Sequence, residues 1–102
     1  MIVINRFRVP PAQQPAFRAQ AQAAVELFGT KPGLQSIDLV QNLDEPQLWA
    51  LVTRWEHVGA YRRALGGFES KMTIVPLLSL SLDEPSAFDL PDEVGQNLPR
   101  GI

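Results

Sequence analysis

Two polar side chains share a face with apolar residues in amphipathic segments, at positions where they could take part in chemistry. Asn5 belongs to the alternating segment Ile2–Val9, and Tyr61 belongs to the amphipathic segment 57–65. A carboxamide can donate a hydrogen bond to a substrate oxygen, and a phenol can donate or relay a proton. Asn5 and Tyr61 are therefore candidates for the polar residues of an interior pocket.

Aromatic residues could form the wall of such a pocket, because a flat ring system prefers aromatic neighbours. The predicted substrate-binding residues are Phe7, Phe28, Trp55 and Phe68.

Each candidate also has a purely structural interpretation. Asn5 could satisfy a buried backbone group, and Tyr61 could be a core residue whose hydroxyl reaches water. Trp55 and Trp49, which share a strand face, could both belong to the core, and His57 could cap a helix. The sequence leaves these alternatives open.

The composition argues against several classes of function. With 102 residues, 45% of them hydrophobic, the chain suits one domain, and a domain this small gains from a second copy covering an apolar face. The net charge is −2 and the nine Lys and Arg residues are spread out, so no nucleic-acid partner is expected. One histidine and no cysteine do not supply a metal site. No apolar run reaches the roughly 18 residues of a membrane helix, so we expect a cytoplasmic protein without a membrane partner.

The periodicity of apolar residues predicts an α+β domain over residues 1–82. The predicted strands are Ile2–Val9, Leu34–Gln41, Leu48–Glu56 and Leu77–Leu82. The predicted helices are Gln13–Phe28 and a second one from His57, with Val58, Tyr61, Leu65 and Phe68 on one face. This β-α-β-β-α-β order is typical of a ferredoxin-like fold with an antiparallel sheet. Residues 83–102 form an acidic tail with three prolines, predicted to lack regular structure.

The two faces of the predicted sheet carry different types of residue, because successive strand side chains point to opposite faces. Val3, Asn5, Phe7 and Val9 share one face of the first strand, which we predict to meet the helices. The opposite face mixes apolar residues with arginines and carboxylates. Such a mixture suits a subunit interface in which charges pair, so we predict a homodimer formed through the sheet faces. The outward residues of the first strand are Ile2, Ile4, Arg6 and Arg8.

Several short motifs together resemble the antibiotic biosynthesis monooxygenase (ABM) family over roughly residues 1–82. They are Val3-Ile4-Asn5-Arg6-Phe7, Lys31-Pro32-Gly33, Thr53-Arg54-Trp55-Glu56 and Ala60-Tyr61. The resemblance implies a dimeric α+β barrel. Characterised members of the family include cofactor-independent monooxygenases of polycyclic phenols, haem-degrading oxygenases and quinol monooxygenases.

The haem-degrading branch of that family uses an asparagine, a tryptophan and a histidine. Asn5 fits the first position, but the other two fall near Ala64 and Ile74, so the resemblance argues against haem degradation. It implies instead a monooxygenase without a cofactor, acting on a small aromatic or quinol-like metabolite, with Asn5 and Tyr61 as its catalytic polar pair. The alternative is a non-catalytic small-molecule-binding or accessory protein of the same fold.

Overall fold

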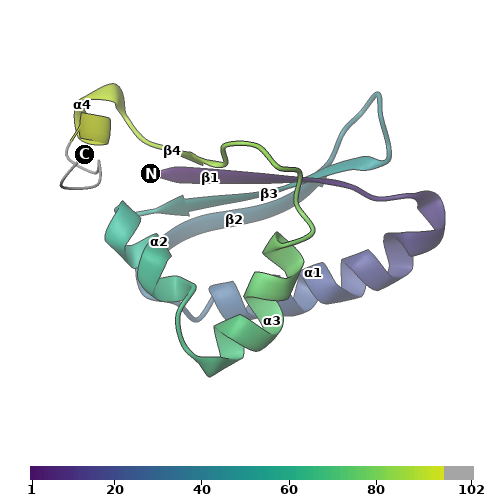
Figure 1. The fold of residues 1–102 in the computed structure, drawn as a ribbon, viewed down its shortest axis with the longest axis horizontal. Coiled ribbons are helices and arrows are strands. Elements are labelled where there is room, and N and C mark those ends of the chain that lie inside the picture. The colour runs from purple at the N-terminus through teal and green to yellow at the C-terminus, as the bar shows by residue number, and fades with distance from the viewer. Residues whose placement is uncertain (96–102) are drawn as a thin grey trace.

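A four-stranded antiparallel sheet forms one layer of the protein. A computed structural model describes residues 1–95. The spatial order of the strands is β2-β3-β1-β4, so the first and third strands lie in the middle (Figure 1). The strands are β1 (Ile2–Arg8), β2 (Leu34–Gln41), β3 (Leu48–Trp55) and the two-residue β4 (Ala87–Phe88).

Helices form the second layer and cover one face of the sheet (Figure 1). The long helix α1 packs beside α3, and α2 follows directly after β3. The element order and the antiparallel sheet confirm the predicted ferredoxin-like α+β fold. The helices are η1 (Pro11–Gln13), α1 (Gln14–Phe28), α2 (Val58–Ala64), α3 (Phe68–Leu78) and α4 (Pro91–Val94).

The last third of the chain differs from the sequence prediction. Leu77 and Leu78 end helix α3 and do not begin a strand, and the fourth strand lies instead at Ala87–Phe88. The misleading residue was Pro76, which normally breaks a helix because it lacks an N–H. Here its missing donor would have bonded the carbonyl of Met72, a residue on the solvent side of α3 that is 63% exposed. The tail is also more regular than predicted, since it contributes β4 and α4.

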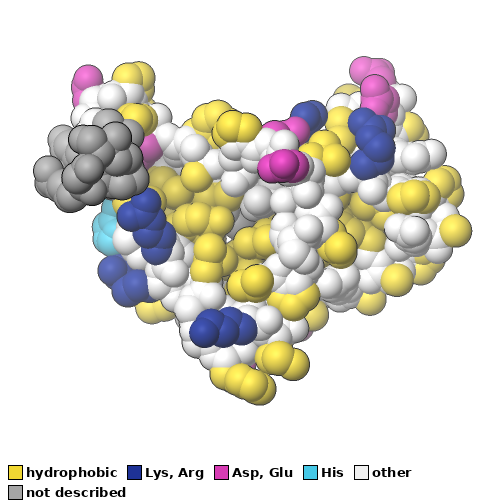
Figure 2. All heavy atoms as spheres, in the orientation of Figure 1, with side chains coloured by type: hydrophobic (Ala, Val, Ile, Leu, Met, Phe, Trp, Pro, Cys, Tyr) yellow, Lys and Arg dark blue, Asp and Glu magenta, His cyan; other side chains and the backbone are white. Residues whose placement is uncertain are grey.

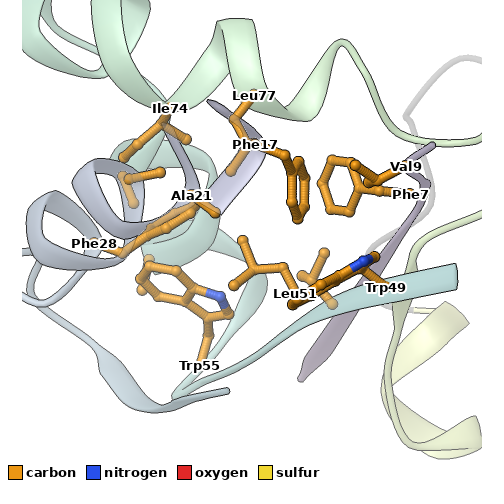
Figure 3. Packing of buried hydrophobic residues seen from close by; sticks show 14 residues of the cluster. Phe7, Val9, Phe17, Ala21, Phe28, Trp49, Leu51, Trp55, Ile74 and Leu77 are labelled. Atoms are coloured by element: carbon orange, nitrogen blue, oxygen red, sulfur yellow. The ribbon is translucent and has the colours of Figure 1, made fainter. Parts of the chain in front are cut away.

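The core fills the space between the sheet and the helices (Figure 3). The prediction that Val3, Asn5, Phe7 and Val9 face the helices is confirmed, because all four are at most 8% exposed. Trp49, Leu51, Thr53 and Trp55 of β3 share this inner face and are also buried.

The approach of α2 to the sheet depends on one glycine. Gly33 has a positive φ of +91°, and a Cβ at this position would lie 2.5 Å from that of Ala60 in α2. The Gly33 carbonyl also accepts a hydrogen bond from Glu56 N–H at 2.9 Å. At the start of α2, His57 Nδ1 accepts the Ala60 N–H at 3.1 Å, which confirms its capping role. These contacts fix the helix that carries Tyr61.

The outer face of the sheet carries charges among apolar side chains. Arg6 forms a two-pronged ion pair with Glu84, and Arg8 contacts Glu45 at 3.3 Å. Val40, which also lies on this face, is 46% exposed. The face thus has the mixed character that the sequence predicts.

Candidate functional site

Asn5 lies in the middle of β1 and faces the helices. It is 8% exposed, and its neighbour across the sheet is Leu51, which is fully buried. Within residues 1–95, the Asn5 carboxamide has no hydrogen-bond partner. The two other buried polar residues, Thr53 and Ser70, are both hydrogen-bonded. Asn5 therefore carries donors and an acceptor that the described chain leaves unused.

Tyr61 projects from α2 and is half-buried. Its ring centroid lies 5.7 Å from that of Trp55. Burial raises the pKa of the Tyr61 phenol above its usual value, because the phenolate would lose its hydration. At neutral pH the phenol therefore keeps its proton, and the described residues offer its hydroxyl no hydrogen-bond partner. It can serve as a donor rather than as a base.

The predicted aromatic residues fall into two separate clusters. Phe28 and Trp55 pack edge to face at 5.7 Å, next to Tyr61, at one end of the inner face. Phe7 packs against Phe17 at 5.2 Å at the other end (Figure 3). Because Phe7, Phe28 and Trp55 are each at most 1% exposed, they are core residues in this conformation.

Phe68 lies away from the other candidates. It is 80% exposed, at the start of α3, beside Leu27 and Met72. The sequence pattern placed it on one helix face with Tyr61, but the chain leaves the helical conformation at Gly67, where φ is +88°. Helix α3 begins after this break with a new orientation, so the periodicity does not continue. This placement of Phe68 was wrong.

Trp49 has a feature that the sequence does not reveal. Its indole Nε1–H is fully buried and has no hydrogen-bond partner within residues 1–95, whereas the indole of Trp55 donates to Thr53 Oγ1 at 2.8 Å. Trp49 contacts Phe17 at 5.6 Å and lies opposite Phe7 in the sheet. Its position on the inner face was readable from strand alternation, but the unpaired N–H depends on packing and was not.

A cleft lies at one end of the inner face. A half-open cleft of about 350 Å³ lies where α1 meets the end of β1, lined by Phe7, Val9, Phe17 and Leu80 among others. Hydrophobic side chains also gather below the edge of the sheet, between α2 and α3 (Figure 2). Asn5 lines none of the larger surface clefts within residues 1–95.

The chemistry available on the inner face is that of neutral donors in an apolar setting. Each buried polar residue of the described chain is uncharged: Asn5, Thr53 and Ser70. In a low-dielectric site, such donors stabilise an anion more strongly than they would in water. None of the helices within residues 1–95 has the length and hydropathy needed to cross a membrane.

Comparisons with known proteins agree with this geometry. The family model described as "Antibiotic biosynthesis monooxygenase" matches residues 1–71. Among curated protein sequences, none matches significantly.

Solved structures share the fold. SnoaB, a cofactor-independent oxygenase from Streptomyces nogalater, is 25% identical, with 79% of this chain and 82% of that chain covered and a TM-score of 0.68. Rv0793 from Mycobacterium tuberculosis is 26% identical, with 84% and 86% covered and a TM-score of 0.66. A conserved protein from Methanosarcina mazei is 21% identical, with 84% of each chain covered and a TM-score of 0.70.

Proposed function

The chain belongs to the antibiotic biosynthesis monooxygenase family, and we propose that it is a cofactor-independent monooxygenase acting on a small aromatic or quinol-like metabolite. The similarity to SnoaB, a cofactor-independent oxygenase, supports this activity.

The observation that carries the proposal is the unpaired carboxamide of Asn5. Among residues 1–95, Trp49 Nε1 is the one fully buried side-chain nitrogen or oxygen without a partner, so the Asn5 amide, in a residue that is 8% exposed, keeps slight contact with solvent. A group in that state is open to a partner from outside the chain. A ligand oxygen would supply the missing partner. The residues around it are apolar and aromatic, which suits a flat ring carrying one or two oxygens.

The reaction needs an electron-rich substrate that can itself reduce dioxygen. A quinol and O₂ give a hydroxyquinone and water, so the quinol supplies all four electrons and one oxygen atom enters the ring. The first step is transfer of a phenolic proton from the quinol to solvent water, because the anion reduces dioxygen more readily. Asn5 would hold that anion through its amide N–H, and Tyr61 would donate a proton to the reduced oxygen that leaves as water.

Oxygen uptake tests the proposal. With 1,4-naphthohydroquinone as probe, we expect uptake above the autoxidation rate measured without protein, and at least a tenfold loss in Asn5→Ala. The matched control is Asn42→Ala, because Asn42 is an exposed residue whose Oδ1 accepts backbone N–H groups in the β2–β3 turn. Equal rates in Asn5→Ala and the unmutated protein would remove Asn5 from the mechanism. Uptake that never exceeds autoxidation would contradict the activity on this probe class.

A binding or accessory protein with the same fold is the second candidate. The tight packing of Phe28 and Trp55 favours it, because these rings form core rather than an open pocket wall. A binding protein would take up the naphthohydroquinone and leave it unchanged beyond autoxidation, whereas an oxygenase would form the hydroxyquinone. Mass spectrometry of the small molecule after incubation separates the two.

We also propose that the active form is a homodimer joined through the outer sheet faces. The half-buried Ile4 and Val52 lie side by side there, next to the Arg6–Glu84 pair. A facing copy would shield these apolar side chains. Native mass spectrometry should show a dimer that Val52→Asp converts to monomer. A monomeric unmutated protein, or a dimer unaffected by Val52→Asp, would contradict this arrangement.

A further inference from the structure

One segment that belongs to no helix or strand borders β1 beside Asn5. Residues 79–86, here called the strap, connect α3 to β4 along the edge of β1 that faces away from β3 (Figure 1). Two backbone hydrogen bonds join the strap to this edge. Leu82 N–H donates to the Arg6 carbonyl at 2.8 Å, and Ile4 N–H donates to the Ser86 carbonyl at 2.7 Å.

The register between the strap and β1 slips opposite Asn5. The pairing of Ile2 with Phe88 and of Val3 with Ala87, extended along the strands, would place Pro85 opposite Asn5. The backbone N–H of Asn5 points toward β3, so strap hydrogen bonds are expected only at its neighbours Ile4 and Arg6. In the same register Glu84 would bond Arg6, but Leu82 does so instead, so two extra residues bulge from the edge. Three strap residues, 83–85, therefore lie between the two hydrogen bonds that flank Asn5, where a regular register would have one.

An ion pair provides the further link between the strap and β1. Arg6 Nε and Nη2 donate to the two Glu84 carboxylate oxygens at 2.8 and 2.7 Å. Within residues 1–95 it is the only side-chain hydrogen-bonded contact between these two segments. The side chains are 42% and 30% exposed, so solvent weakens the pair without abolishing it.

The other walls around the inner face are much more firmly packed. Phe28, Ile74 and Leu77 are at most 1% exposed, whereas Leu80 in the strap is 57% exposed. Segments with few buried contacts and few backbone hydrogen bonds open at the lowest free-energy cost. A ligand that reaches Asn5 meets least resistance at the strap.

We propose that the strap is a gate, which opens between Leu82 and Ser86 to admit a ligand to Asn5 and which the Arg6–Glu84 ion pair holds closed. That Asn5 receives a ligand, and that this ligand is aromatic or quinol-like, rests on the proposed function; the opening of the strap does not.

A single introduced thiol can measure the opening directly, because the chain contains no cysteine. In Asn5→Cys, the rate of reaction with dithiodipyridine, an uncharged aromatic disulfide, reports access to position 5. Adding Glu84→Gln should raise this rate roughly 2- to 5-fold, as expected for loss of a partly exposed ion pair. Adding Glu45→Gln is the matched control, because it removes the same charge from the Arg8–Glu45 pair, which does not touch the strap. It should leave the rate unchanged.

A second thiol position separates gate opening from unfolding of the whole domain. Ala24 is fully buried in α1, so the thiol of Ala24→Cys should react only after global unfolding. Glu84→Gln should not change its rate. An unchanged rate at position 5, or equal acceleration at positions 5 and 24, would overturn the gate.

Amide hydrogen exchange gives the same test without a cysteine, should Asn5→Cys fail to fold. In Glu84→Gln, the Leu82 and Ile4 amides should exchange several-fold faster, while the Asn5 amide, which points toward β3, should not. Uniform or absent acceleration would again overturn the gate. Neither experiment involves turnover, so a failed gate leaves the oxygenase proposal standing, and a failed oxygenase assay leaves the gate to be decided here.

Discussion

The two faces of the sheet satisfy their polar groups in different ways. On the outer face, Arg6 and Arg8 reach carboxylates from neighbouring loops, and solvent reaches the same groups. On the largely buried inner face, the Trp49 indole N–H is fully buried without a partner among residues 1–95, and Asn5, which is 8% exposed, makes no side-chain hydrogen bond there. An unpaired group costs little at a surface and much in a core. The contrast teaches that the informative polar residues of this protein lie on its apolar side.

The largest expected effect contrasts the two faces by truncating one side chain on each. Phe28→Ala on the inner side should lower the free energy of unfolding by about 3–5 kcal/mol, because it leaves a cavity against Trp55. Val52→Ala on the half-buried outer face should cost less than about 1.5 kcal/mol in the monomer. Urea unfolding at low protein concentration measures both. Comparable losses would mean that the outer face is as well packed as the inner one.

A second, smaller effect tests how closely the helix layer approaches the sheet. Gly33→Ala must adopt a positive φ, and its new Cβ must also displace Ala60. At Gly67, where φ is a similar +88°, an added Cβ would have no neighbouring atom within 4 Å. In each variant, we expect the strain of an alanine held at positive φ to lower the free energy of unfolding by about 1–3 kcal/mol. Gly33→Ala should lose more, because of the contact with α2. Comparing the thermal unfolding of the two variants isolates the effect of that contact. Equal losses of stability would show that α2 can shift away from Gly33 at no cost.

The smallest expected effect concerns Tyr61, the only tyrosine of the chain. Its pKa is raised by burial in the folded protein, so the folded state resists ionisation that the unfolded state undergoes near pH 10. The contribution of this group is therefore constant below that pH and is lost as the pH rises through the folded pKa. Ultraviolet titration of the phenolate should show a midpoint above 10 in the native protein. A midpoint at or below the value in urea would contradict the buried placement.

Most of the architecture could be predicted from the sequence, because it rests on local periodicity. The strand Leu34–Gln41 has the predicted bounds, and the first helix begins one residue later than predicted. The fourth strand could not be predicted, since two residues carry no period-two signal and Pro76 suggested a break inside α3. Strand alternation also placed Asn5, Phe7 and Trp55 on the inner face.

The details of the site were less accessible to sequence reasoning. Phe68 was misplaced because Gly67 resets the direction of the helix. The unpaired state of Asn5 and Trp49 depends on which atoms meet in the folded chain, and no spacing rule encodes that. The aromatic wall likewise became two clusters, because tertiary packing decides which rings touch.

The most direct test of the central claim compares Asn5→Leu with the unmutated protein in urea unfolding, with the oxygen-uptake assay run on the same samples. If Asn5 is kept for a ligand rather than for the fold, replacing its unpaired amide by an apolar group of similar size should leave the free energy of unfolding unchanged or raise it by up to about 1 kcal/mol. The same change should abolish naphthohydroquinone-dependent uptake. A loss of stability in Asn5→Leu would show that the amide supports the fold, and would contradict the account.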